Sequence, residues 1–218
     1  MQPRMHEDIT QFSFEEFVAF LFARSVAPET EADPWYWNVQ VTFDLARVCQ
    51  HYMRLFQAPS FLLEQFSKEQ LEQGFWAIQS CNLDCSVTQL IWDTDLPFAA
   101  RAECVRSMLD LFKGLFAAEA LDTSVHMWWD SLCYDWHCGN RNRDRGGEDA
   151  SMQDVMFQTL SKILALDSPV CQGAALHGLG HLHHPETEHL VQEYLKQRTS
   201  LSEDWKAYAL AAARFEVM

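Results

Sequence analysis

The chain has 218 residues, and its hydrophobic share of 48% is ample for the core of one large domain or two small ones. Glycine and proline are sparse, at 8 and 7 residues, which argues against an all-β fold with many turns. The formal net charge of −15 repels phosphate backbones and anionic lipid surfaces, so we expect no nucleic-acid and no membrane partner. A basic protein would be attracted instead.

The seven cysteines are an odd number, and most of them lie in apolar helical contexts. This usage is typical of reduced, buried thiols rather than of a disulfide framework. The first ten residues lack the basic region and the apolar run of a signal peptide. No apolar stretch approaches the roughly 20 residues that a helix needs to cross a bilayer. We therefore expect a cytoplasmic protein.

The first 138 residues predict a series of helices. Ser13 and Glu16 have the spacing of a capping box, and Ser67 and Gln70 have it again at the start of a later helix. Pro97 stands in the first turn of a long helix, where its missing N–H costs nothing. The expected helices cover residues 13–25, 39–57, 60–66, 67–78, 97–118 and 123–138.

Three consecutive aromatic residues, Trp35, Tyr36 and Trp37, lie in the loop between the first two expected helices. Exposed aromatic side chains can anchor a protein partner. The same side chains can instead cover an edge of the core. Both interpretations stay open, and the three residues are candidate partner-binding residues.

A polar stripe runs along the helix expected over 123–138. It consists of His126, Asp130, Cys133 and His137, at positions i, i+4, i+7 and i+11. Each of these residue types can bind a metal or take part in acid–base chemistry, and a Cys–His pair four residues apart can act as nucleophile and base. No glycine-rich turn surrounds Cys133, so the polar face of an ordinary helix is the favoured interpretation.

The segment 139–150 is polar and contains three glycines, which is typical of a linker. It divides the chain into an N-terminal helical region, residues 1–138, and a C-terminal region, residues 151–218, although the two can also form one continuous domain. Arg141, Arg143 and Arg145 form a local basic cluster in this linker. They are candidate residues for binding a phosphate or an acidic partner, and a solvated loop is the alternative.

The stretch from Ser168 to His184 predicts a helix packed closely against its neighbours. Ser168 is a suitable N-cap, Pro169 suits the first helical position, and Pro185 disfavours continuation beyond His184. One face carries mostly small residues. It consists of Cys171, Ala174, Ala175, Gly178, Leu179 and Leu182.

The segment 202–218 repeats this pattern at an offset of 34 residues. Ser168 corresponds to Ser202, Cys171 to Trp205, and Ala175 to Ala209. Helix pairs repeated at this period bury their apolar faces by stacking on each other. On these residues the chain resembles HEAT-like repeats from about residue 153 to 218. The resemblance implies stacked helical hairpins and carries no implication for function.

His177, His181 and His184 lie at i, i+4 and i+7 on the other face of the same helix. Three such imidazoles are candidate ligands for zinc, which commonly takes three protein ligands and a water in catalytic sites. Gly178 stands where a metalloprotease helix has its glutamate, so that motif is not matched. A solvated or cleft-lining histidine face and pH-dependent partner binding are the alternatives.

These patterns predict an all-α protein, a right-handed stack of about ten helices with HEAT-like hairpins at its C-terminal end. The leading functional hypothesis is a non-catalytic module that binds another protein, such as an acidic inhibitor or immunity-type protein bound to a basic partner. It needs no cofactor and assigns no catalytic residue. The alternative is a zinc-dependent hydrolase that uses the histidine cluster. A pocket for an apolar ligand among the aromatic residues is a third hypothesis.

Overall fold

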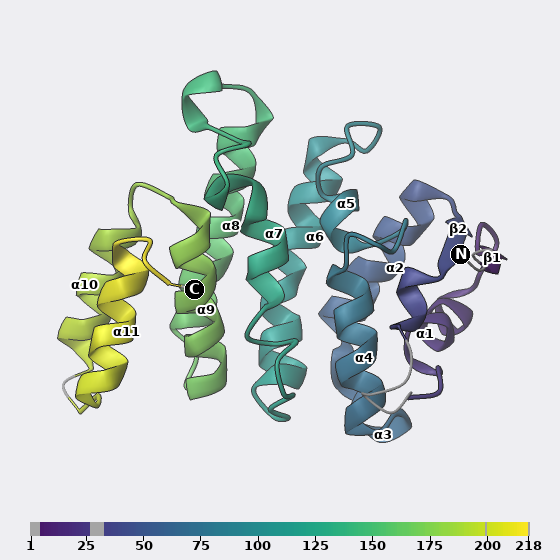
Figure 1. The fold of residues 1–218 in the computed structure, drawn as a ribbon, viewed down its shortest axis with the longest axis horizontal. Coiled ribbons are helices and arrows are strands. Elements are labelled where there is room, and N and C mark those ends of the chain that lie inside the picture. Colours follow the sequence, from purple (N-terminus) through teal and green to yellow (C-terminus); the bar gives the residue numbers. More distant parts are fainter. Residues whose placement is uncertain (1–4, 27–32, 199, 218) are drawn as a thin grey trace. The chain divides into compact units, whose positions relative to one another are not determined.

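A computed structural model describes residues 5–26, 33–198 and 200–217, and over these residues the chain is helical except for one pair of short strands (Figure 1). The expectation of an all-α, multi-helix fold is confirmed. The chain divides into two compact units, residues 1–124 and 125–218. None of the helices within the described ranges combines the length and the apolar character needed to cross a membrane.

The first unit begins with a parallel strand pair that the sequence analysis missed. Strand β1, Met5–Asp8, pairs with β2, Val39–Thr42, so that Met5 faces Val39 and Asp8 faces Thr42. The expected helix over 39–57 was therefore wrong in its first part. The chain alternates between buried and exposed residues along β2, a period of two that suits a strand.

Helices of the first unit follow in chain order and largely match the expected ones. Both predicted capping boxes are present, at Ser13 with Glu16 and at Ser67 with Gln70. The long helix expected from Pro97 is α-helical only to Leu111 and continues as a π-helical turn. The α-helices are α1 Phe14–Phe22, α2 Leu45–Gln57, α3 Leu62–Gln65, α4 Lys68–Gln79, α5 Val87–Leu90 and α6 Phe98–Leu111.

The second unit consists of five α-helices over its described residues. They are α7 Trp128–His137, α8 Glu148–Leu164, α9 Pro169–Leu182, α10 Thr187–Gln197 and α11 Glu203–Ala213. The segment 139–150 lies inside this unit rather than between two domains, because α7 packs against α9. It contains a short 3-10 helix, Arg143–Arg145, and extends beyond the end of α8 at the top of Figure 1.

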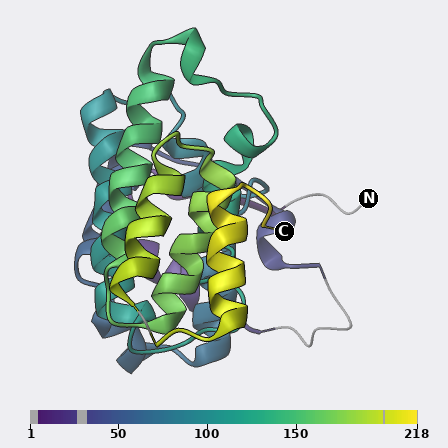
Figure 2. The ribbon, with the colours of Figure 1, turned by 90° about the vertical axis from the view of Figure 1, so that its left-hand side faces the viewer.

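Helix α9 is the centre of the second unit and packs against α7, α8 and α11, while α10 packs against α11. Figure 2 shows α8, α9, α10 and α11 side by side. The expectation that the small-residue helix and its copy are neighbours is confirmed. Ser168 and Ser202 both cap their helices, with side chains that accept from the backbone N–H three residues on.

Helix α9 ends two residues earlier than expected. His183 takes the left-handed conformation, with φ 55° and ψ 33°, and so forms the C-terminal cap. His184 therefore lies outside the helix and does not continue the face that carries His177 and His181.

Candidate metal centre

A glycine lets α9 approach α7 closely. A Cβ atom at Gly178 would overlap the Cβ and Cγ atoms of Trp129 on α7 and would lie 2.9 Å from Leu160 Cδ2 on α8. The contact buries the histidines of α9, so that His177 is 1% exposed and His181 5% exposed. Since Asp130 follows Trp129 directly, the same contact places the polar side of α7 against these two histidines.

Asp130, His177 and His181 each bring one ligand atom to a common point. Asp130 Oδ1 lies 3.1 Å from His181 Nε2 and 4.0 Å from His177 Nε2, and the two nitrogens are 3.2 Å apart. Ligand atoms bound tetrahedrally at about 2.0–2.1 Å from a zinc ion are about 3.3 Å apart. The separations of His181 from Asp130 and from His177 match this spacing, and the separation of 4.0 Å between Asp130 and His177 is longer. In the described part of the chain, no other group of three such side chains converges in this way.

Two further histidines flank the three ligands, His126 just before α7 and His137 at its end. The ring centroid of His126 lies 4.4 Å from that of His177, and the ring centroid of His137 lies 4.5 Å from that of His181. Both flanking residues are exposed, and the Asp130 side chain is 33% exposed. The centre is thus reached by solvent from the side of α7. Structural zinc sites are closed by four protein ligands, whereas catalytic sites keep one position open.

The two buried imidazoles differ in their remaining contacts. His177 Nδ1 lies 3.2 Å from the hydroxyl oxygen of Tyr208 on α11, and His181 Nδ1 is buried with no hydrogen-bond partner among the described residues. A histidine that binds a metal through one nitrogen usually donates the other N–H to a neighbouring group. The contact with Tyr208 therefore suits the tautomer in which His177 Nε2 carries the lone pair.

Burial keeps both imidazoles uncharged near neutral pH. It lowers the pKa of His177 to about 3, with a further contribution from the neighbouring His126, His181 and His137. Burial also lowers the pKa of His181, although the Asp130 carboxylate acts in the opposite direction. Metal ions bind the neutral form of histidine, so neither side chain has to lose a proton before it binds an ion at neutral pH.

The third histidine of the predicted face, His184, lies apart from this centre. Its Nε2 is 3.0 Å from Asp154 Oδ1 on α8, and its ring stacks on Phe157 with centroids 4.0 Å apart. The left-handed conformation of His183 turns the chain here, which separates His184 from His177 and His181.

The polar stripe of α7 is divided by the fold. His126, Asp130 and His137 face α9, as the contacts above show, whereas Cys133 is fully buried. Burial, and next the charge of Asp130, raise the pKa of the Cys133 thiol well above its ordinary value. A thiolate nucleophile is therefore disfavoured at this position.

The consecutive aromatic residues of the first unit form a 3-10 helix, Trp35–Trp37. Tyr36 is buried, and Trp35 packs edge-on against Phe20 with ring centroids 5.3 Å apart. Trp37 is 45% exposed. Two of the three candidate partner-binding aromatics thus cover the core, and Trp37 lies at the surface.

The arginine cluster is largely engaged in ion pairs. Arg141 pairs with Asp135 and Asp149, and Arg143 pairs with Asp154. Arg145 is exposed and donates to a backbone carbonyl in the same segment. Arg141 and Arg143 line a pocket of the second unit, whereas Arg145 does not.

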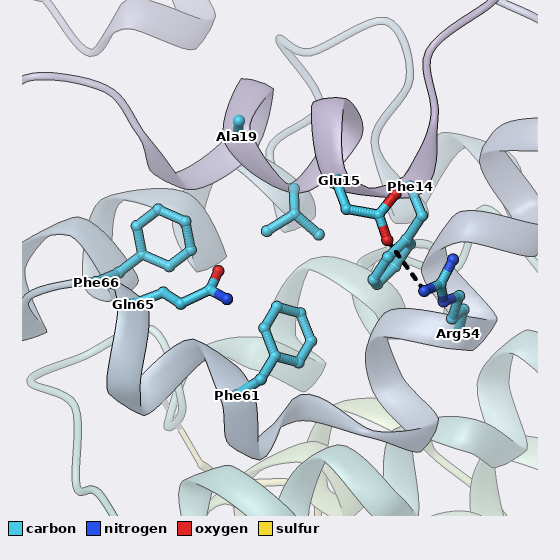
Figure 3. A pocket seen from close by; sticks show the side chains of 8 residues that line it. Phe14, Glu15, Ala19, Arg54, Phe61, Gln65 and Phe66 are labelled. Atoms are coloured by element: carbon cyan, nitrogen blue, oxygen red, sulfur yellow. Dashed lines mark hydrogen bonds and ion pairs between the residues drawn. The ribbon is translucent and has the colours of Figure 1, made fainter.

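The first unit contains a mostly apolar pocket of about 280 Å³ (Figure 3). Figure 3 shows Phe14 of α1 together with Phe61 and Phe66 around it. At its edge Arg54 Nη2 lies 3.1 Å from Glu15 Oε1. Ligand pockets combine apolar walls with a few polar groups directed at the ligand. In this pocket, the charged groups of Arg54 and Glu15 are directed at each other and not at the space that a ligand would fill.

Comparison of the chain with protein-family models, with curated proteins and with solved structures gives no match. The proposed function therefore depends on the geometry of the second unit. From the sequence, His177 and His181 were predicted as candidate ligands, and Asp130 was assigned to a separate stripe. The three glycines on the histidine helix indicated a close neighbour, but they did not identify α7 as that neighbour.

Proposed function

We propose that the protein is a metal-dependent hydrolase that binds a divalent transition-metal ion through Asp130, His177 and His181. The observation that supports this most directly is the convergence of three ligand atoms from two helices, at separations of 3.1, 3.2 and 4.0 Å. Zinc takes such ligand sets in hydrolases. Two histidines and one carboxylate also bind non-haem iron, so the metal panel below includes iron.

The arrangement suits activation of a water molecule. An ion with three protein ligands keeps a position for water and can lower the pKa of that water to about 7. His126 or His137, exposed beside the ligands, would accept the proton as the water becomes hydroxide. The same histidine would return that proton to the leaving group of a hydrolysed substrate.

The metal site is tested by metal analysis and titration of the full chain. Metal-free protein is titrated with Zn²⁺, Fe²⁺ and Mn²⁺ in competition with a chromophoric chelator. We expect one equivalent of at least one ion to bind. Asp130→Asn and His181→Gln should each weaken that binding by a factor of about 100 or more, because each removes one of three ligands while preserving its approximate shape.

His189→Ala is the matched control, because His189 is an exposed histidine on α10 outside the centre. It should bind the ion as the wild type does. Thermal unfolding of each variant establishes that it is folded. If folded Asp130→Asn and His181→Gln retain wild-type affinity, or if no ion binds the wild type, the metal site is refuted.

A second candidate function is that of an acidic protein-binding module. The net charge of −15 and the exposed Trp37 favour it, since an acidic surface accelerates association with a basic partner and an exposed aromatic residue can anchor one. Capture of a basic partner should weaken as salt rises and should weaken further in Trp37→Ala. Capture that is indifferent to both would refute this candidate.

We also propose that α8 with α9 and α10 with α11 are two HEAT-like repeats in a cytoplasmic protein. The 34-residue offset and the matching serine caps of α9 and α11 support the repeat assignment. A sequence designed from the repeat consensus should replace α10 and α11 and keep the unit folded, as circular dichroism would show. Failure of every such replacement to fold would count against the assignment.

A further inference from the structure

A pocket in the second unit combines positively charged side chains with a neighbouring metal centre. Its volume is about 460 Å³, and its lining includes Arg141, Asn142, Arg143, Asp144, Gln153 and His183. The lining thus carries two guanidinium groups together with one carboxylate. The oxyanions of phosphates and carboxylates are the groups that guanidinium side chains recognise best.

The two arginines are held in fixed positions at the pocket wall. Arg141 is oriented by Asp135 and Asp149, at 3.1 and 2.6 Å. The Nη1 atom of Arg143 lies 2.6 Å from Asp154 Oδ1 and 2.8 Å from Gln153 Oε1.

Both side chains remain partly exposed, Arg141 by 23% and Arg143 by 33%. Side chains that are already ordered lose little entropy when they bind a ligand. The carboxylates of Asp135, Asp149 and Asp154 offset the positive charge of the two arginines, but they also fix the orientation of the guanidinium groups. Fixed guanidinium groups favour selective binding of small anions over general electrostatic attraction.

His183 also lines the pocket and supplies a further polar group. Its ring stacks on Phe215, with centroids 4.5 Å apart and an interplanar angle of 17°. Its Nε2 atom is buried and has no hydrogen-bond partner among the described residues. In the tautomer that carries a proton on Nε2, this nitrogen can donate to an oxyanion, and a bound ligand would satisfy a buried group that otherwise costs about 1–3 kcal/mol.

The pocket lies next to the metal centre. The ring centroid of His183 is 5.5 Å from that of His137, which is in turn 4.5 Å from that of the ligand His181. A small molecule held in the pocket by its anionic group would therefore need to span only about one or two side-chain lengths to reach the metal ligands.

We propose that this pocket binds the oxyanion group, phosphate or carboxylate, of a small anionic substrate and directs the rest of that substrate to the metal centre. The proposal rests on the proposed function for its second part, the delivery to the metal. The binding of the anion itself depends on Arg141, Arg143 and His183 alone, so it is tested separately.

Inorganic phosphate is the probe, titrated by calorimetry into the full chain after removal of metal by a chelator. We expect saturable binding of one phosphate. Arg143→Gln should weaken it by a factor of about ten, in line with the loss of one charge-assisted contact of about 1.4 kcal/mol. Arg145→Gln is the matched control, because Arg145 belongs to the same segment but does not line the pocket. It should change the affinity by less than twofold.

Arg143 also holds its segment to α8, so a second variant protects the test against local unfolding. His183→Phe keeps an aromatic ring against Phe215 and removes the Nε2 donor, and it should weaken phosphate binding severalfold. Equal affinity of the wild type, Arg143→Gln and His183→Phe, or the absence of saturable binding, would overturn the proposal. Competition by acetate assigns the pocket to carboxylates as well, whereas a lack of competition restricts it to phosphates.

The two titrations distinguish a pocket that does not bind phosphate from a metal centre that does not bind an ion. His181→Gln should abolish metal binding and leave phosphate affinity unchanged in the metal-free protein. Arg143→Gln should lower phosphate affinity and leave zinc affinity unchanged. If phosphate binds but none of Zn²⁺, Fe²⁺ and Mn²⁺ does, the pocket stands and the hydrolase proposal fails.

Discussion

Glu72 on α4 collects more hydrogen bonds than an ordinary surface carboxylate. It accepts from the backbone N–H groups of Asp122, Thr123 and Ser124, at 3.1, 2.9 and 2.8 Å. It also accepts from the hydroxyls of Thr123 and Ser124 and from the indole N–H of Trp76. One side chain thus fixes the last three residues of the first unit to α4.

Glu72→Gln should lower the free energy of unfolding at pH 7 by about 1–3 kcal/mol, because a neutral amide replaces a carboxylate that accepts several exposed and part-buried hydrogen bonds. Urea unfolding, monitored by circular dichroism, measures the change. Glu64→Gln is the control, since Glu64 is an exposed glutamate on α3, and it should change the stability by less than about 0.5 kcal/mol. An equal effect of the two substitutions would contradict the role of Glu72.

The stabilisation by Glu72 should disappear in acid. Burial raises the pKa of this carboxyl, but the hydrogen bonds from Ser124 and Thr123 together lower it below its ordinary value of 4.5. A carboxyl with a depressed pKa in the folded state contributes its full stabilisation above the unfolded-state pKa and loses it as the pH falls through the folded-state pKa. The stability difference between wild type and Glu72→Gln should therefore shrink from pH 5 toward pH 3. A constant difference would refute this assignment.

Single residues of the candidate site were predictable to different degrees. His177 and His181 were identified as candidate ligands because helical spacing alone places them on one face. His184 has suitable spacing too, but the left-handed conformation of His183 removes it from the helix. Pro185 indicated an end near His184, but non-glycine residues adopt the left-handed conformation uncommonly, so the earlier end at Leu182 was not predicted.

At the level of helices, the metal centre depends on the close contact between α7 and α9. Gly178→Ala places a methyl group against Trp129 and Leu160, which have to move apart. We expect a loss of stability of about 1–3 kcal/mol from overpacking, and weaker zinc binding because Asp130 is displaced together with α7. Thermal unfolding and chelator competition measure the two effects.

Gly173→Ala is the matched substitution in the same helix. A Cβ atom there would meet only Trp205 Cη2 at 3.5 Å, an ordinary contact. Because alanine is the better helix former, this variant should be more stable by about 0.5–1 kcal/mol and should bind zinc as the wild type does. If both glycine variants behaved alike, the close contact at Gly178 would not be what positions the site.

Helix starts were predicted more reliably than the pairing of elements. The caps at Ser13, Ser67 and Ser168 are present because a cap depends on residues within one turn of each other. The strand β2 was missed because its partner β1 lies 34 residues away in sequence, as Met5 paired with Val39 shows. The proximity of Asp130 to His181 was missed for the same reason, since it depends on which helix packs against α9.

At the level of the whole molecule, all three candidate metal ligands belong to the second unit. A ligand that binds only the folded state stabilises it by about 2.7 kcal/mol at a concentration 100 times its dissociation constant. Zinc should therefore slow amide hydrogen exchange in α7 and α9 and leave residues 5–26 and 33–124 nearly unchanged. Equal protection of both units, or protection of neither, would contradict this expectation.

The fold class could be predicted from the whole chain because helical periodicity, sparse glycine and the 34-residue offset all indicate the same architecture. The division into units could not. The polar, glycine-containing segment 139–150 has the composition of a linker, yet α7 before it and α8 after it both pack against α9. Composition reports how polar a segment is, whereas packing decides to which unit its flanking helices belong.

The central claim is that one metal ion binds between α7 and α9. Anomalous diffraction at the zinc absorption edge, from crystals of the full chain grown with zinc, tests it most directly. The account predicts a peak about 2.0–2.2 Å from Asp130 Oδ1, His177 Nε2 and His181 Nε2. A well-ordered crystal with no peak at this position, or with zinc only at other residues, would contradict it.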